Sequence, residues 1–249
     1  MTAAARRLRV VGPGRAGRSL AGALTSVGWT LAGFVGRDDD LAAAASGVDL
    51  VVIATPDASI AQVAAAIDPD PAAVVAHLAG SLGLDVLAGH PRVAGLHPLV
   101  PLPDPERGEA RLLAGTWFAV AGDPLVCDVV RDLGGRWFEV ADRDRAAYHA
   151  AAAVASNHLV ALLGQVERIA KGIGVPPAAY LDLAQAALDD VAARGAAAAL
   201  TGPVARGDWD TVARHLAALD PTERDAYRAL AAAARRLVDN TTTLPPNLP

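Results

Sequence analysis

A glycine-rich loop near the N-terminus constrains the fold of this chain more than any other stretch. The apolar run 8–11 is followed by Gly12-Pro13-Gly14-Arg15-Ala16-Gly17, and the next residues have a helical pattern. A strand, a G-x-G-x-x-G loop and a helix, in that order, form the unit that binds a dinucleotide in open parallel α/β sheets. The stretch therefore predicts nucleotide binding. The alternative is an ordinary turn in a chain rich in alanine and glycine.

Each glycine of the loop has a separate expected role. Gly12 permits the tight turn, Gly14 lets the backbone approach a pyrophosphate, and Gly17 lets the helix pack closely on the strand. The helix begins at Ala16, just after Arg15, so its free N–H groups and the positive end of its dipole face the bound anion. We predict that these five residues bind the cofactor.

The residues after the second expected strand, 30–35, bear on which nicotinamide cofactor is bound. Arg37 lies about 20 residues after Gly17, where a site for NAD usually has an acidic residue that bonds the ribose 2′-hydroxyl. An arginine there suits the 2′-phosphate of NADP instead. We therefore predict NADP. Asp38 is adjacent, so NAD stays an alternative, and Arg37 could also be a solvated turn residue.

Strands and helices alternate up to about residue 140, which predicts an α/β domain of the Rossmann type with a parallel sheet. Further strands are expected at 49–54, 73–78, 93–96, 116–121 and 136–140, helices at 16–27, 58–67 and 124–133, and a proline-rich loop at 99–111. Open α/β sheets bind ligands beyond the carboxyl ends of their strands. The residues expected on that side are Thr55, Pro56, His77, Gly80 and Ser81. Ser81 could instead cap a helix.

From residue 142 onward the pattern is helical only. Helices are expected at about 143–172, 177–194, 209–219 and 221–240, with a break at 195–207. Asp208 can cap the third of these helices, and Asp220-Pro221-Thr222-Glu223 supplies an N-cap, a proline at N1 and an acid at N3 for the last. The expected domains are a Rossmann domain at 1–141 and an all-α domain at 142–240, followed by a disordered tail at 241–249.

Charge and cysteine content exclude several classes of protein. The net charge of -5 argues against a nucleic-acid scaffold, which needs a basic face. Cys127 is the only cysteine, so an intrachain disulfide and a cysteine-based zinc site are excluded, and we expect no metal site. Residues 146–164 carry no formal charge but include polar side chains that a membrane span rarely tolerates together: Tyr148, His149, Ser156, Asn157 and His158. The N-terminus lacks a signal-peptide pattern, and we expect a cytoplasmic protein that binds neither membrane nor nucleic acid.

Four stretches resemble the 6-phosphogluconate dehydrogenase-like superfamily, in which a Rossmann domain precedes a helical domain. They are residues 11–17 (VGPGRAG), 95–99 (GLHPL), 148–157 (YHAAAAVASN) and 200–208 (LTGPVARGD). Together they look like a bacterial oxidoreductase family with a helical domain of unknown function (2520 type), and the resemblance spans nearly the whole chain. It implies a reductase related to ketopantoate reductases. The superfamily also includes pyrroline-5-carboxylate reductases and prephenate dehydrogenases.

Dehydrogenases of this superfamily often use a lysine and an asparagine on the first helix of the second domain, and this chain departs from that pattern. Lys171 is the only lysine, and it lies roughly 21 Å along the helix from Asn157 at ~1.5 Å per residue, too far to share a small substrate. His149 is therefore predicted as the proton donor, with Ser156 two turns later on the same face and Asn157 on its flank. His97 is the rival donor. A purely structural hydrogen-bonding role for His149 and Asn157 is the alternative.

These features predict an NADP-dependent oxidoreductase that reduces a small, ketopantoate-like 2-oxo acid by hydride transfer. Within the same class, the alternatives are a cyclic-imine reductase and a prephenate-type dehydrogenase. In a different class, the missing lysine leaves a catalytically silent NADP-binding or sensor protein as an alternative. We expect a small-molecule substrate, and also a homodimer, because the helices of the second domain would otherwise expose much apolar surface.

Overall fold

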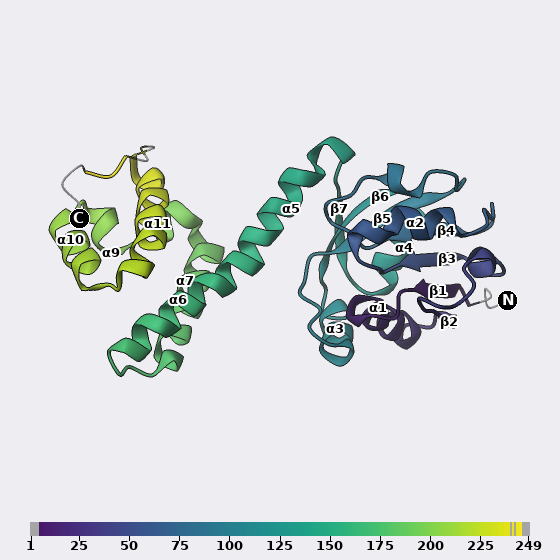
Figure 1. The fold of residues 1–249 in the computed structure, drawn as a ribbon, viewed down its shortest axis with the longest axis horizontal. Helices are drawn as coiled ribbons and strands as arrows, with labels where there is room; N and C mark the ends of the chain where they lie inside the picture. The colour runs from purple at the N-terminus through teal and green to yellow at the C-terminus, as the bar shows by residue number, and fades with distance from the viewer. Residues whose placement is uncertain (1–4, 240, 242, 246–249) are drawn as a thin grey trace. The chain divides into compact units, whose positions relative to one another are not determined.

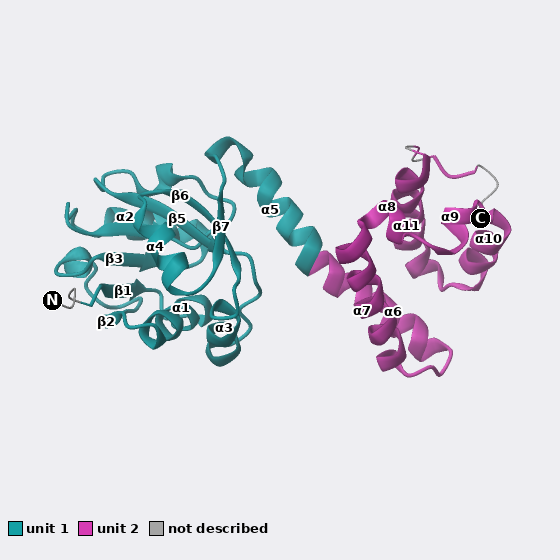
Figure 2. Ribbon diagram, turned by 180° about the vertical axis from the view of Figure 1, so that it is seen from behind, with its two compact units in different colours: residues 1–156 teal, residues 157–249 magenta. Residues whose placement is uncertain are grey.

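The chain divides into two compact units in the computed structural model, which describes residues 5–239, 241 and 243–245. The first unit comprises Met1–Ser156 and the second Asn157–Pro249 (Figures 1 and 2). The first is an α/β unit and the second is helical, which confirms the predicted fold class. The division falls after Ser156, whereas the sequence predicts a boundary near residue 141. The helix that begins at Arg145 belongs to the first unit because the Arg145 side chain is buried against the sheet.

Within the described residues, a seven-stranded sheet in the order β2-β1-β3-β4-β5-β6-β7 forms the centre of the first unit. The strands are β1 (Arg7–Val11), β2 (Thr30–Val35), β3 (Leu50–Ile53), β4 (Val74–His77), β5 (Val93–Pro98), β6 (Trp117–Gly122) and β7 (Arg136–Glu139). Neighbouring strands from β2 to β5 pair in parallel. β2 lies on one side of β1, and β3 lies on the other side, so the strand order reverses at β1. Such a switch point is where open sheets bind ligands.

Helices cover both faces of this sheet (Figure 1). The side chains of α1 (Arg15–Ser26), α3 (Pro105–Leu112) and α4 (Leu125–Asp132) join one apolar cluster. A second cluster includes side chains of α2 (Ile60–Ala65) and of two 3-10 turns, η1 (Ala42–Ala45) and η3 (Leu84–Leu87). The predicted helix 58–67 is thus shorter, and a 3-10 turn, η2 (Asp57–Ser59), precedes it.

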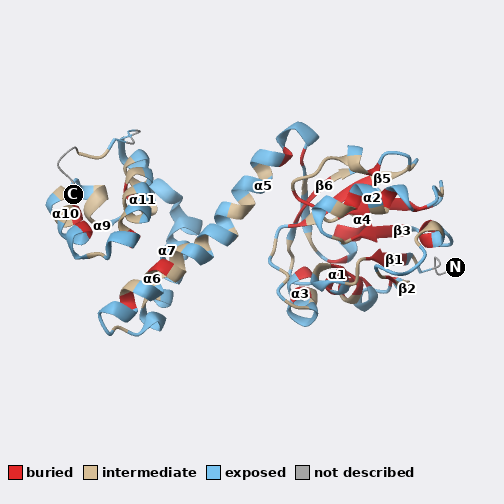
Figure 3. Cartoon of the chain, viewed as in Figure 1, coloured by how far each residue is buried: buried red, intermediate tan, exposed pale blue. Residues whose placement is uncertain are grey.

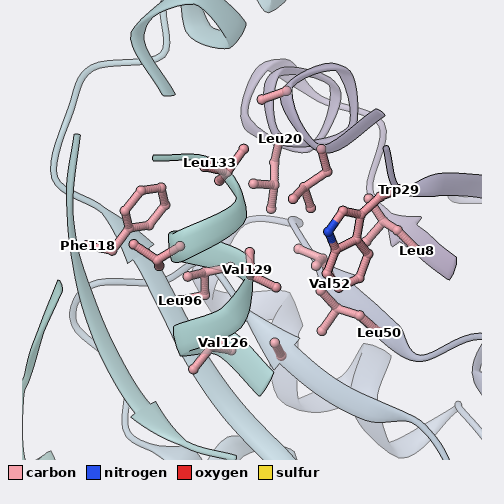
Figure 4. Packing of buried hydrophobic residues seen from close by; sticks show 14 of the residues in the cluster. Leu8, Leu20, Trp29, Leu50, Val52, Leu96, Phe118, Val126, Val129 and Leu133 are labelled. Atoms are coloured by element: carbon pink, nitrogen blue, oxygen red, sulfur yellow. The ribbon is translucent and has the colours of Figure 1, made fainter. Parts of the chain in front are cut away.

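The central strand β3 shows why both faces need a cover. Leu50 and Val52 belong to the first cluster, whereas Val51 and Ile53 belong to the second. All four side chains are fully buried (Figure 3), so the strand has no polar face, as is typical of a parallel strand inside a sheet. Figure 4 shows Leu50 and Val52 among the packed side chains of the first cluster.

The strand β6 and the segment before it differ from the prediction. β6 runs antiparallel to β5, with Pro98 opposite Phe118. The connection after β5 returns to the sheet at the same end of the strands at which it left. Part of the predicted loop 99–111 is α3, which packs on α1. The Asp104 carboxylate accepts a hydrogen bond from the N–H of Arg107 at 2.8 Å, and proline lies in the first turn. This is the same start pattern that the sequence shows at residues 220–223.

The predicted helix 143–172 is interrupted. It consists of a 3-10 turn, η4 (Asp142–Asp144), then α5 (Arg145–Ala153), a π-helical turn, η5 (Val154–His158), and α6 (Leu159–Gly172). By length and composition alone, the 31-residue stretch Asp142–Gly172 could cross a membrane: an 18-residue window within it has a mean hydropathy of 1.2, and 0% of that window is buried. One such helix is weak evidence, because core helices of water-soluble proteins pass the same test. Arg145 within it is 1% exposed and packs against the sheet of the first unit.

The remaining helices of the second unit begin and end close to the predicted positions. They are α7 (Pro177–Arg194), α10 (Trp209–Ala218) and α11 (Pro221–Asp239). The carboxylates of Asp208 and Asp220 accept hydrogen bonds from the N–H groups of Thr211 (3.1 Å) and Thr222 (2.9 Å), as capping predicts. The expected break contains two short helices, α8 (Ala196–Ala199) and α9 (Gly202–Arg206). Of the predicted tail, residues 242 and 246–249 lie outside the described residues.

Candidate functional site

A cavity of about 580 Å³ opens beyond the carboxyl ends of β1, β2 and β3. It is lined by residues 11–14, 36–37 and 54–56, which follow these strands, and by Leu41, Ser59, Gln62, Val63 and Ala66. Five residues predicted to bind the cofactor are among those lining it: Gly12, Gly14, Arg37, Thr55 and Pro56. Small-molecule sites typically have volumes of about 300–1,000 Å³. The switch point of the sheet therefore carries a cavity of suitable size, and the cofactor assignment of these residues stays a prediction.

The three glycines of the loop meet different surroundings. Gly12 has φ +93, and a Cβ there would lie 2.9 Å from the backbone carbon of Ala54. A Cβ on Gly17 would lie 2.5 Å from the carbonyl oxygen of Gly12, so this glycine lets α1 pack on β1. A Cβ on Gly14 would meet no atom within 4 Å. Gly12 and Gly17 are thus required by the fold itself, whereas Gly14 borders the open space of the cavity.

The start of α1 and the side chain of Thr55 both present unsatisfied polar groups. Gly14 is the N-cap of α1 and has no side chain to accept a hydrogen bond from the amide of Ala16 or Gly17. Such first-turn amides, with the helix dipole, form an anion site. The Thr55 hydroxyl is buried and has no hydrogen-bond partner among the described residues. A buried hydroxyl without a partner is costly, so a ligand oxygen here would satisfy it. These residues fit a bound dinucleotide.

Arg37 is the charged residue in the lining of this cavity. Its side chain is exposed, and within the described part of the chain it forms no ion pair. The neighbouring Asp39 carboxylate accepts a hydrogen bond from the N–H of Gly36 at 2.7 Å, so it stabilises the turn. Asp38 does not line the cavity. The turn after β2 therefore directs a cation at the cavity.

A second group of candidate residues meets beyond the ends of β4 and β5. A Cβ on Gly80 would lie 2.8 Å from Cδ2 of His149 and 2.9 Å from Nε2 of His97. The two imidazole rings have centroids 6.1 Å apart and meet edge to face. His97 is half-buried and His149 is exposed. The structure thus brings together the two rival donors and a glycine that the sequence assigns to the cofactor side.

Tyr148 is the residue of this cluster that sequence reasoning misses. Its hydroxyl lies 2.5 Å from Nδ1 of His97, and the two rings meet edge to face at 5.6 Å. Phe138 packs against the other side of Tyr148, with centroids 5.8 Å apart. The pair Tyr148-His149 is visible in the sequence, but its contact with a histidine 51 residues away depends on the register of the sheet.

Arg145 lies behind this cluster. It is 1% exposed, and none of its guanidinium nitrogens has a hydrogen-bond partner among the described residues. The nearest carboxylate oxygen, on Asp142, is 3.8 Å from Nε. Burial, followed by the positive charges of His149 and Arg145, lowers the pKa of His97 to about 4. His97 is therefore neutral across the physiological range.

The remaining predicted residues lie as follows. Ser81 donates a hydrogen bond to the Asp57 carboxylate at 2.9 Å and does not cap a helix, because the next helical turn begins after Gly83. His77 is fully buried, with Nε2 3.2 Å from the carbonyl oxygen of Gly83. It is therefore not at the cavity surface. Arg15, Ala16, Gly17, Gly80 and Ser81 do not line the cavity.

Ser156 and Asn157 lie in the π-helical turn between α5 and α6. The Ser156 hydroxyl donates to the carbonyl oxygen of Ala152 at 2.8 Å. The sequence predicts that Ser156 lies two helical turns after His149. Because a π turn contains more residues than an α turn, the seven-residue spacing between them is not two full turns here. Asn157 begins the second unit, and its contact with substrate stays a prediction.

Residues 118–234 match a family model described as a domain of unknown function (DUF2520), which runs from β6 to α11. No curated protein matches the chain.

Solved structures share the fold over nearly the whole chain. A protein from Bacteroides fragilis, provisionally described as an NADP oxidoreductase, is 19% identical, covers 93% of this chain and 98% of its own, and superposes with a TM-score of 0.78. A Thermotoga maritima protein is 24% identical over 94% and 98% of the two chains, with a TM-score of 0.72. Plasmodium falciparum pyrroline carboxylate reductase with NADP bound is 13% identical over 94% and 98%, with a TM-score of 0.62. The chain therefore has the same Rossmann-plus-helical fold as these proteins, and its residues 118–234 match the DUF2520 domain.

Proposed function

We propose that this chain is an NADP-dependent oxidoreductase that transfers a hydride to a small polar carbonyl or imine. The observation that carries the proposal is one continuous edge of the sheet. The cavity with its glycine loop and Arg37 lies beyond β1 to β3, and the cluster around His97 lies beyond the neighbouring strands β4 and β5. The bond from Ser81 to Asp57 joins these two parts of the edge. Two structural neighbours are themselves described in terms of NADP.

The residues present have a division of labour in this proposal. The loop at Gly12 and Gly14, which lines the cavity, and the N-terminus of α1 that follows it hold the pyrophosphate, and Arg37 holds the 2′-phosphate. When bound, the cofactor supplies the hydride. Gly80 lets the imidazole rings of His97 and His149 approach the backbone after β4, because a Cβ there would lie 2.8 to 2.9 Å from them. His97, through Nε2, and the exposed His149 then contact the oxygen or nitrogen of the substrate.

For the substrate, we propose a 2-oxo acid like ketopantoate, in keeping with the family resemblance. A cyclic imine is the second candidate, because the Plasmodium falciparum neighbour is a pyrroline carboxylate reductase. A prephenate-like acid is the third. A non-catalytic NADP sensor also stays a candidate, since Lys171, the only lysine, lies in the last turn of α6, about 14 residues along the helix from Asn157.

A substrate panel tests this function. Purified protein is mixed with NADPH and with individual 2-oxo acids, cyclic imines and prephenate, and the loss of reduced-nicotinamide absorbance is followed. Consumption with a 2-oxo acid supports the proposal, whereas consumption only with an imine favours the second candidate. Tight NADPH binding with no consumption by any compound would establish the sensor instead.

Arg37→Ala is expected to weaken NADPH binding by about 10- to 100-fold, the scale for losing a charge-assisted hydrogen bond. NADH, which lacks the 2′-phosphate, should bind with little change. Calorimetric titration of both cofactors against both proteins measures this difference. Arg107→Ala, an exposed arginine on α3, is the matched control and should leave both affinities unaltered. Equal losses for NADPH and NADH, or tighter native binding of NADH, would contradict the assignment.

We also propose that the second unit forms a homodimer. Several of its large apolar side chains are exposed: Val160, Ile173, Leu181, Leu183, Leu188 and Val191. The helix α7 has no buried residue at all, and patches of this kind mark interfaces. Light scattering should therefore give twice the chain mass of 25.3 kDa, and Leu183→Asp should shift the protein towards the monomer. A monomer in the native protein would refute the dimer.

A further inference from the structure

The contact between Tyr148 and His97 raises the question of which group donates the hydrogen. Tyr148 hydroxyl oxygen and His97 Nδ1 are 2.5 Å apart. Among the described residues, no other hydrogen-bond partner is found for either the Tyr148 hydroxyl or Nε2 of His97. If His97 donated through Nδ1, the tyrosine proton would have no acceptor, and a half-buried O–H without an acceptor is unfavourable. The tyrosine therefore donates, and Nδ1 accepts.

This direction of the hydrogen bond determines the tautomer of His97. Because Nδ1 accepts, the proton of the neutral ring is on Nε2. Nε2 and the neighbouring Cε1 of His97 lie beside Gly80, where a Cβ would be 2.9 Å from each. The donor edge of the imidazole thus faces the part of the sheet edge where the substrate is proposed to lie.

The charges around the ring favour its neutral form. From α5, Arg145 and His149 face it, and from β4, His77 does so, while Asp57 from η2 is the opposing carboxylate. Burial raises the pKa of Tyr148 to about 12, so its hydroxyl keeps its proton at every pH of interest. The Arg145 guanidinium lies against Gly95, because a Cβ on this glycine would be only 2.9 Å from a guanidinium nitrogen. The cation thus sits where β5 has no side chain.

We propose that Tyr148 is a positioning residue: its hydroxyl holds His97 as a neutral imidazole with the proton on Nε2, so that His97 donates a hydrogen bond to the substrate but does not give up its proton. The catalytic part of this inference rests on the proposed function, whereas the tautomer does not. In a carbonyl reduction, the carbonyl carbon gains the hydride from NADPH, and the π electron pair moves to the oxygen. That oxygen then takes a proton from a group other than His97, and His97 keeps its hydrogen on Nε2 throughout. A neutral imidazole acting as an electrophile in this manner is known from other enzymes.

The first test reads the tautomer directly in the full-length protein. Nitrogen chemical shifts of isotope-labelled histidine distinguish a protonated from an unprotonated ring nitrogen, and His97→Gln identifies the His97 signals among the 6 histidines. We expect native His97 to carry its proton on Nε2 and to stay neutral down to about pH 5, above its pKa of about 4. A proton on Nδ1, or titration near the ordinary pKa of about 6.5, would overturn the proposal.

Tyr148→Phe removes only the hydroxyl, and a second pair in the chain provides its control. Tyr227 also places its hydroxyl 2.7 Å from Nδ1 of a histidine, His215, in the second unit. Tyr148→Phe should convert His97 to a mixture of tautomers, and Tyr227→Phe should leave His97 unchanged. An unaltered His97 tautomer in Tyr148→Phe overturns the proposal, even if the variant is less stable. The native spectrum alone decides the matter if the variant does not fold.

Turnover separates this inference from the proposed function. Tyr148→Phe should lower kcat by about 10-fold, the scale for one lost hydrogen bond, with an unchanged KM for NADPH, whereas Tyr227→Phe should keep the native kcat. An unchanged kcat in Tyr148→Phe would refute the catalytic part. If no substrate is turned over but the spectra show the expected tautomer, the positioning role is supported and the proposed function fails.

Discussion

Replacing His97 by Ala is expected to lower kcat by about 10²- to 10³-fold, the range for removing one preorganised donor to a developing negative charge. NADPH binding should be unaffected, because His97 does not line the cavity beyond β1 to β3. Burial, with the positive charges of His149 and Arg145, lowers the pKa of His97 to about 4. Its neutral donor form is thus complete above that pH, and activity due to His97 is lost only as the pH falls through about 4.

His149→Ala is the comparison that identifies the two roles. If His149 supplies the proton, its loss should lower the rate by about 10²- to 10⁴-fold and remove an ionisation from the pH–rate profile. His97→Ala should keep that ionisation, because the pKa of His97 is about 4 and its ring is already neutral at higher pH. His158→Ala, an exposed histidine of the π turn, is the control. If His97→Ala removes the ionisation and His149→Ala does not, His97 is the proton donor and not a neutral one.

Gly14→Val is expected to abolish binding of NADPH while leaving the protein folded. The backbone of Gly14 has φ -76 and ψ -170, which valine adopts without strain. A Cβ at this position meets no protein atom within 4 Å, so the added side chain occupies only space that a pyrophosphate would need. Titration with NADPH should detect no saturation at concentrations about 100-fold above the native Kd.

The choice of Gly14 makes this test specific to ligand binding. Valine at Gly12 or Gly17 would collide with the backbone and disturb the fold, so loss of binding there would be ambiguous. Gly172→Val, at the end of α6 with no atom within 4 Å of its Cβ position, is the control for adding a branched side chain. Native affinity in Gly14→Val would mean that the loop is only a turn.

The elements that depend on neighbouring residues alone could be predicted from the sequence. The strand, glycine loop and helix at residues 7–26, and the helix starts at Asp208 and Asp220, depend on backbone conformation and capping within a few residues. The same capping rule applied to Asp104 would have found α3. The continuous apolar run of β3 likewise announces a strand buried on both faces, because that pattern needs no distant partner to be recognised.

Features that depend on contacts between distant parts of the chain could not be predicted from the sequence. The antiparallel direction of β6 follows from where the chain returns after α3, and no periodicity encodes it. The meeting of Gly80, His97 and Tyr148 requires β4, β5 and α5 to pack in one register, over separations that a motif cannot span. The glycine loop could be predicted from the sequence because it is one local turn, whereas the cavity beside it also needs the residues after β2 and β3, which only the folded sheet brings next to that loop. The pairing of His97 with Tyr148, and the burial of Arg145 behind them, exist only because the folded sheet brings side chains from several elements together.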